Sequence, residues 1–286
     1  MILVTGANGN LGAATINFLL KKIPAENIRA LVRSEEKGIT LKEKGIEIAL
    51  GDYFNSQSLA SAMKGIDTLM LVSASSVKDR YQQHANAINA AKEAGVRHIV
   101  YSSILKASPN TKFAAGLDHV NTEADIENSG IDYTIMRNTY YSDFLPMILG
   151  DFRDSGQVFY SAGDAKINFA LRADMAEANA NVLADPSAHR NKVYNITSSA
   201  TYSFNDIAGM LTSIVKKPIT YIDIPLNDLN NGMLQHGIPV EVAEMLTSIA
   251  ASMRDGEFDY ADNTLSTLIE HKPLDLKDFL ASIYSL

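Results

Sequence analysis

The chain opens with a short apolar run that leads directly into a loop with three evenly spaced glycines. Ile2 to Thr5 have the composition of a buried strand, and Gly6, Gly9 and Gly12 follow in the pattern Gly-x-x-Gly-x-x-Gly. The apolar residues that recur at helical spacing after this loop are Ile16, Leu19 and Leu20. A strand, a glycine turn and a helix in this order are typical of the first unit of a dinucleotide-binding fold.

The same rhythm of short strands and longer helical segments continues over the first 135 residues. Apolar runs that lack a clean alternation indicate strands buried on both faces, and therefore a parallel sheet covered by helices on each side. Right-handed crossovers make a doubly wound, Rossmann-like α/β sheet the expected fold. The expected strands are Ile2–Thr5, Ile28–Val32, Ile46–Leu50, Thr68–Val72, His98–Ser102 and Tyr133–Met136.

Beyond residue 150 this rhythm breaks, so we expect a second, smaller α+β lobe. The sequence predicts an NAD(P)-binding domain over 1–150 and a substrate-binding lobe over 151–286, with returning strands that join the first sheet. The expected strands of the second half are Val158–Tyr160, Val193–Ile196 and Ile219–Ile222, and the expected helices are Ala173–Ala184, Phe204–Lys216 and most of the tail from Leu226.

Composition and charge exclude several classes of protein. The 25 basic and 33 acidic side chains give a formal charge of −8, which argues against binding to nucleic acid. The chain has no cysteine, so disulfide and thiolate chemistry are excluded. A signal peptide and a membrane-spanning run are both missing from the sequence, and we expect a cytoplasmic protein that does not bind membranes.

The glycine loop and the end of the second strand together predict NADPH. Within the loop, Gly6 allows a tight turn, Gly9 lets backbone N–H groups approach a pyrophosphate, and Gly12 allows close helix packing. The expected phosphate-binding residues are Gly6, Ala7, Asn8, Gly9, Asn10, Leu11 and Gly12. Arg33 stands where NAD-specific folds place a carboxylate, and its guanidinium suits a 2′-phosphate, with Lys37 in support. The competing interpretation is a solvated Arg33 that pairs with Glu35 or Glu36.

Two further strand ends complete the expected cofactor site. Asp52 follows the third strand, where a carboxylate can accept from the adenine amino group, and Ser73, Ala74 and Ser75 follow the fourth, near the ribose and pyrophosphate. Both segments can also be ordinary polar strand ends, and this alternative stays open.

These motifs, taken together, resemble the NmrA-like branch of the atypical short-chain dehydrogenases, and most closely its members that reduce quinones and triphenylmethane dyes. The resemblance runs nearly end to end and also includes Arg137, Gly163-Asp164 and Arg172-Ala173-Asp174. It implies NADPH as cofactor, reduction of small, planar, electrophilic acceptors, and cofactor contacts at Asn138, Tyr140, Tyr141 and Ser142 in addition to the segments above.

The helix after the fifth strand lacks the Tyr-x-x-x-Lys pair that ordinary short-chain dehydrogenases use as acid and base. Its place is taken by residues 116–123, in which His119 and Glu123 lie four residues apart and can share one face. We expect His119 to donate to a developing quinol oxygen. The alternative is an exposed His119 that pairs with Glu123. His84 can serve either a helix-terminal hydrogen bond or the substrate.

Aromatic residues after the sixth strand are candidates for the wall of an acceptor pocket. We expect one of Tyr140 and Tyr141 to line this pocket and the other to pack inside, although aromatic residues at such spacing are more often core. The remaining histidines lack metal-ligand spacing, so no metal site is expected.

Three functions are compatible with this reading, and the leading one is an NADPH-dependent reductase of quinones or related aromatic acceptors. The first alternative is an NADP(H)-binding redox sensor that acts through a protein partner, because the tyrosine–lysine pair is missing. The second is a sugar-nucleotide epimerase, which needs that pair. Monomer and homodimer both stay open.

Overall fold

The first strand of the chain lies in the middle of a seven-stranded sheet. The computed structural model describes residues 1–285, and its sheet has the order β10-β6-β5-β4-β1-β2-β3. The pairs β1–β2, β1–β4, β2–β3 and β4–β5 are parallel. The strands are β1 (Ile2–Val4), β2 (Ile28–Val32), β3 (Glu47–Leu50), β4 (Thr68–Leu71), β5 (His98–Ile104), β6 (Asp132–Asn138) and β10 (Lys192–Ile196). The expected doubly wound α/β sheet is confirmed.

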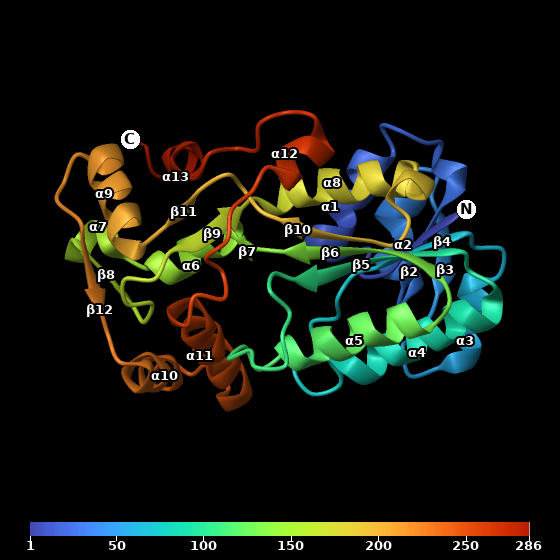
Figure 1. Ribbon diagram of the computed structural model, residues 1–286, viewed down its shortest axis with the longest axis horizontal. Coiled ribbons are helices and arrows are strands. Elements are labelled where there is room, and N and C mark those ends of the chain that lie inside the picture. The colour runs from blue at the N-terminus through green and yellow to red at the C-terminus, as the bar shows by residue number, and fades with distance from the viewer. Residues whose placement is uncertain (286) are drawn as a thin grey trace. The chain divides into compact units, whose positions relative to one another are not determined.

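Helices cover both faces of this sheet, as its apolar strands require. Helices α3, α4 and α5 lie on one face, and α1 and α8 pack side by side on the other (Figure 1). The core between the sheet and helices α3, α4 and α5 contains the fully buried Leu3, Leu69 and Tyr101. The helices are α1 (Asn10–Leu19), α2 (Glu35–Lys42), α3 (Ser56–Met63), α4 (Arg80–Ala94), α5 (Gly116–Asn128) and α8 (Arg172–Ala184), with 3-10 turns at Ala25–Asn27 and Pro186–His189.

The strand order reverses between β1 and β4, and this reversal positions the site. In open parallel sheets a crevice forms at such a switch point, outside the carboxyl ends of the two strands. The loop with the three glycines follows β1, and the Ser73–Ser75 segment follows β4. A hydrogen bond of 2.9 Å from the Val72 N–H to Thr5 Oγ1 joins the two strand ends.

The chain divides into two compact units that interleave along the sequence. The first contains residues 1–104, 118–137 and 172–194, and the second contains 105–117, 138–171 and 195–286. We expected one boundary near residue 150, whereas the chain passes from one observed unit to the other five times. Strand β10, from the second half of the chain, joins the edge of the large sheet beside β6.

The second unit is built from small sheets and short helices. Strands β11, β9 and β7 form one sheet, and β12 and β8 pair in parallel. The strands are β7 (Tyr140–Tyr141), β8 (Gln157–Tyr160), β9 (Ile167–Ala170), β11 (Thr201–Tyr202) and β12 (Thr220–Asp223). The helices are α6 (Leu145–Leu149), α7 (Phe152–Ser155), α9 (Phe204–Val215), α10 (Leu226–Gln235), α11 (Val240–Arg254), α12 (Thr264–Ile269) and α13 (Leu276–Tyr284), with a 3-10 turn at Ser142–Phe144.

None of the helices within residues 1–285 is long and apolar enough to cross a membrane.

Candidate functional site

The glycine loop folds back on itself between β1 and α1. Gly6 adopts a φ of +58°, a left-handed conformation that glycine adopts without strain, and its carbonyl oxygen accepts from the Gly9 N–H at 2.8 Å. A Cβ atom on Gly12 would overlap the Gly6 carbonyl oxygen. Gly12 is therefore needed so that α1 can begin directly against the loop.

The N-terminus of α1 is free to bind an anion. Gly9 occupies the position before the helix, no side chain caps the first turn, and this turn contains no acidic residue. The first N–H groups of a helix need acceptors, and they carry the positive end of its dipole. A pyrophosphate fits this position in charge and in hydrogen-bonding capacity.

Arg33 lies exposed just after β2, next to the glycine loop. The Asn8 side-chain amide donates to the Lys37 carbonyl oxygen, so the loop contacts the helix that follows Arg33. Arg33 is solvent-exposed, as its alternative requires, although it forms no ion pair with Glu35 or Glu36 in the described part of the chain. Its role toward a 2′-phosphate stays a prediction. The guanidinium is free for a 2′-phosphate.

The segment after β4 is held by side chains from other elements. The Ser73 N–H donates to Ser102 Oγ at 2.8 Å. The Ala74 N–H donates to His84 Nε2 at 2.9 Å, and the Ala74 carbonyl oxygen accepts from Arg80 Nε at 2.7 Å. Both polar groups of the Ala74 backbone are thus bound by α4, which fixes the course of the segment. His84 lies in the second turn of α4 and binds the loop after β4, so the helix-terminal hydrogen bond that was one of its two alternatives is not the bond that it makes.

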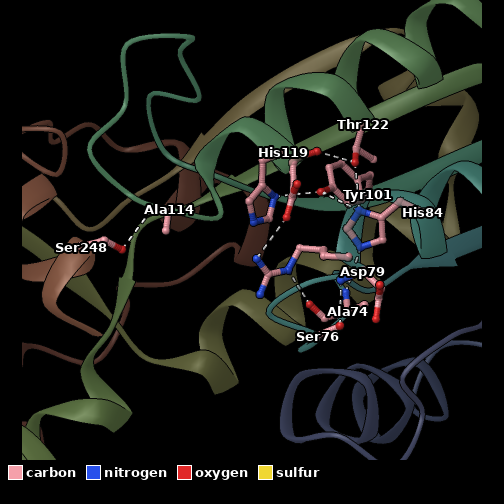
Figure 2. A network of polar contacts seen from close by, with 11 residues as sticks. Ala74, Ser76, Asp79, His84, Tyr101, Ala114, His119, Thr122 and Ser248 are labelled. Atoms are coloured by element: carbon pink, nitrogen blue, oxygen red, sulfur yellow. Dashed lines mark hydrogen bonds and ion pairs between the residues drawn. The ribbon is translucent and has the colours of Figure 1, made fainter. Parts of the chain in front are cut away.

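A buried polar network continues from His84 to His119 (Figure 2). His84 Nδ1 lies 2.9 Å from Thr122 Oγ1, and the Thr122 hydroxyl donates to the Asp118 carbonyl oxygen at 2.6 Å. The Tyr101 hydroxyl lies 2.8 Å from His119 Nδ1. Figure 2 also shows a separate contact within the second unit, from the Ala114 N–H to Ser248 Oγ at 3.0 Å.

Both histidines are neutral in this environment. Burial lowers the pKa of His84 to about 3, and the nearby Arg80 guanidinium acts in the same direction. Burial also lowers the pKa of His119 well below its ordinary value, with further contributions from Arg80 and His84. Neither ring therefore carries an extra proton that it could donate as an acid at neutral pH.

The alternative of an exposed His119 paired with Glu123 is wrong. His119 is only 7% exposed and contacts Tyr101, because its ring points into the network and not toward the next turn of α5. Glu123 is buried as well, and its carboxylate accepts from Ser103 Oγ at 2.5 Å and from two nitrogens of Arg137. Glu123 fastens α5 to β5 and β6.

Asp52 lies exposed after β3, and one of its carboxylate oxygens accepts from the Phe54 N–H at 2.8 Å. This local hydrogen bond is compatible with the alternative of an ordinary polar strand end. A role toward adenine stays a prediction.

The remaining predicted residues gather in the second unit around β7. Asn138 Nδ2 donates to the Tyr141 hydroxyl at 3.2 Å, and Asn138 Oδ1 is buried without a partner in the described residues. Tyr140 is 8% exposed and packs against the rings of Phe169, Phe258 and Phe144. Tyr141 is half-buried beside Phe144, whereas Ser142 is buried.

Three side chains of the buried network, those of Arg80, Tyr101 and Thr122, were not predicted from the sequence. Arg80 is 6% exposed, and it lies four residues before His84, so the helical spacing of the two could have indicated a shared target. Tyr101 stands in an apolar strand and gives no signal that separates it from core. No group of His, Asp or Glu within residues 1–285 is arranged to hold a metal ion.

Comparison with known proteins agrees with this geometry. The model of the NmrA-like family matches residues 1–280. The chain is 36% identical over 287 residues to quinone oxidoreductase 2 of Escherichia coli, with 100% of this chain and 99% of the relative covered. It is 28% identical over 252 residues to the NAD(P)H azoreductase of Xenophilus azovorans, with 88% and 86% covered.

Solved structures of two NADPH-binding reductases are also similar to this chain. The NADPH-dependent quinone oxidoreductase of Escherichia coli in complex with NADPH superposes with a TM-score of 0.93 at 35% identity, and 100% of each chain is covered. The triphenylmethane reductase of Citrobacter sp. in complex with NADP(H) gives 0.92 at 33% identity, with 99% of each chain covered.

Proposed function

The chain belongs to the NmrA-like family, and from this premise we propose that it is an NADPH-dependent reductase that transfers hydride to quinones and related planar aromatic acceptors. The observation that carries the proposal is the uncapped N-terminus of α1 behind a glycine loop, at the point where the strand order reverses. Relatives named as quinone, azo-dye and triphenylmethane reductases indicate the class of acceptor.

We assign the parts of the cofactor to the residues that fit them. The pyrophosphate belongs at the loop Gly6–Gly12, and the 2′-phosphate belongs at Arg33, with Lys37 close by. Asp52 is assigned to the adenine, the Ser73–Ser75 segment to the ribose, and Asn138, Tyr140, Tyr141 and Ser142 to the nicotinamide side. The buried, unpartnered Asn138 Oδ1 supports the last assignment, because it is an acceptor that lacks a donor.

For this reaction the protein has mainly to position the cofactor and the acceptor relative to each other. NADPH supplies a hydride when it is bound. A quinone that takes up this hydride and one proton from water becomes a hydroquinone, which balances both electrons and both hydrogens. The acceptor is strongly electrophilic, so the missing tyrosine–lysine pair is no obstacle, and the placement of the two reactants accounts for most of the rate.

We further propose that Tyr141 and Phe144 form the wall against which the acceptor lies, since both rings are more exposed than Tyr140. A cytoplasmic location, where NADPH is abundant, fits this activity.

An acceptor panel tests the proposal. Purified protein, dialysed free of flavin, is mixed with NADPH and either a benzoquinone, an azo dye, a triphenylmethane dye, an aldehyde or a nucleotide sugar. We expect NADPH oxidation with the first three and none with the last two. Tight NADPH binding without turnover on any planar acceptor would favour the sensor, and binding of the nucleotide sugar would favour the epimerase.

A further inference from the structure

The direction of every hydrogen bond around His84 follows from its partners. A backbone amide can only donate, so His84 Nε2, which lies 2.9 Å from the Ala74 N–H, must be an unprotonated acceptor. The Thr122 hydroxyl gives its hydrogen to the Asp118 carbonyl oxygen, so its oxygen accepts from His84 Nδ1. His84 is therefore the neutral tautomer with its proton on Nδ1.

The tautomer of His84 limits which ring nitrogen can accept a hydrogen bond from the Tyr101 hydroxyl. The Tyr101 hydroxyl lies 3.5 Å from His84 Nδ1 and 2.8 Å from His119 Nδ1. Because His84 Nδ1 already carries a proton, it cannot accept. The Thr122 and Ser73 hydroxyls also lie near the Tyr101 hydroxyl, and we assign its hydrogen to His119 Nδ1 because that contact, at 2.8 Å, is the shorter of the two to a ring nitrogen. Burial raises the pKa of Tyr101 far above its ordinary value, so the hydroxyl keeps its proton.

The consequence for His119 is a single protonation state. With Nδ1 accepting, the proton of a neutral ring must sit on Nε2, which faces away from Tyr101 (Figure 2). Nε2 has no partner within residues 1–285.

The charged and titratable groups around the ring keep it neutral. Arg80 and His84 on α4 oppose a positive charge on His119, and Tyr101 on β5 stays uncharged. On α5, Asp118 lies 3.7 Å from Arg80, while Glu123 is neutralised by Arg137 at 2.6 Å. Both of these carboxylates on α5 are thus paired with arginines and do not stabilise an imidazolium at His119.

We propose that Tyr101 is a positioning residue that holds His119 as the neutral, Nε2-protonated tautomer, and that this N–H donates a hydrogen bond to the carbonyl oxygen of the bound acceptor. The role of His119 rests on the proposed reductase function, whereas its tautomer does not. A neutral imidazole polarises a carbonyl without giving up its own proton. The acceptor oxygen is therefore protonated from water, and His119 leaves the reaction unchanged.

Nitrogen NMR of histidine-labelled protein tests the tautomer directly, with His119→Gln used to assign the signals. In the wild type we expect an unprotonated Nδ1 and a protonated Nε2 at His119, unchanged between pH 5.5 and 8. In Tyr101→Phe, which removes only the hydroxyl, a mixture of tautomers should appear. Protonated Nδ1 in the wild type, or conversion to imidazolium within this pH range, would overturn the proposal.

Kinetics with a quinone test the role of the tautomer. Tyr101→Phe should lower kcat roughly threefold to tenfold at unchanged KM for NADPH, and His119→Gln, which keeps a side-chain N–H, should retain more activity than His119→Leu. The matched control is Tyr194→Phe, which removes a similar Tyr–His contact of 3.0 Å to His189 and should change neither kcat nor the His119 signals.

The two tests separate failure of this proposal from failure of the proposed function. If the wild type shows the expected His119 tautomer but Tyr101→Phe keeps the full kcat, the proposed role of Tyr101 in the reaction is rejected. A protein that turns over no acceptor would instead reject the reductase function and, with it, the assigned hydrogen bond, while the tautomer would still be decided by NMR.

Discussion

Gly12 lies so close to Gly6 that a Cβ atom on Gly12 would stand 2.8 Å from the Gly6 carbonyl carbon. A Cβ atom on Gly9 would meet the same peptide more loosely, at 3.2 Å from its oxygen. Gly9 has extended backbone angles that any residue can adopt. The two glycines therefore differ in role: Gly12 allows the loop to fold, and Gly9 keeps the anion position open.

Substitution of Gly9 by valine should abolish NADPH binding while the chain still folds. The branched side chain occupies the space above the α1 N-terminus, where a pyrophosphate has to approach the backbone. Circular dichroism should stay native-like, and NADPH should no longer raise Tm. Gly12→Ala is the contrasting variant, since its overlap with Gly6 should lower Tm in the absence of cofactor. A Gly9→Val protein that NADPH still stabilises would refute the assignment.

Replacement of Arg33 by glutamate should remove or reverse a preference for NADPH over NADH. Loss of a charge-assisted clamp together with new repulsion of the 2′-phosphate should cost on the order of 2–4 kcal/mol in binding free energy. Titration with both dinucleotides measures this difference. Lys42→Glu, at the other end of α2, makes the same change of charge and should have little effect. Equal affinities of the wild type for the two dinucleotides would contradict the account.

The features that could be predicted from the sequence are those that local pattern determines. The glycine loop, the strands β1 to β6 and the helices between them follow from apolar runs and turn residues that lie next to one another in the chain. Arg33 was selected because it stands at the end of the second strand, and its role toward a 2′-phosphate stays a prediction.

Features that depend on distant partners were not predicted. Strands β7, β9 and β11 have two to four residues each, and their pairing comes from segments tens of residues away. The same holds for the binding of Ala74 by Arg80 and His84, and for the contact between Tyr101 and His119. The interleaved units were missed as well, because 172–194 returns to the first unit after the chain has left it.

Stability should fall as the pH is lowered from about 6.5 toward 5. The pKa of His84 is about 3 in the folded protein, and that of His119 is also lowered, so the unfolded chain binds protons in this range and the folded chain does not. Each such histidine contributes a slope of up to about 1.4 kcal/mol per pH unit to the free energy of unfolding.

Chemical denaturation at several pH values measures this slope. His84→Gln should make this pH dependence of the free energy of unfolding shallower, by up to the contribution of one histidine. A free energy of unfolding that is constant between pH 6.5 and 5 would show that these rings take up protons while the chain stays folded.

Truncation of Tyr141 should weaken acceptor binding, whereas truncation of Tyr140 should weaken the fold. Tyr140→Ala removes a ring that packs against three phenylalanines and should cost about 3–5 kcal/mol of stability. Tyr141→Ala should raise KM for quinone and lower kcat/KM with little change in NADPH affinity, and Tyr141→Phe, which keeps the ring, should stay near the wild type. An unchanged KM for quinone in Tyr141→Ala would remove Tyr141 from the acceptor wall.

Transfer of deuterium from NADPH to a triphenylmethane dye tests the central claim most directly. The carbon that accepts hydride in such a dye does not exchange with water, so the label survives in the colourless product. With NADPH deuterated at the transferred position of C4 and protein free of flavin, we predict one deuterium per molecule of reduced dye by mass spectrometry, and one NADPH consumed for each. No turnover, or a reduced dye that carries no deuterium, would contradict direct hydride transfer by this protein.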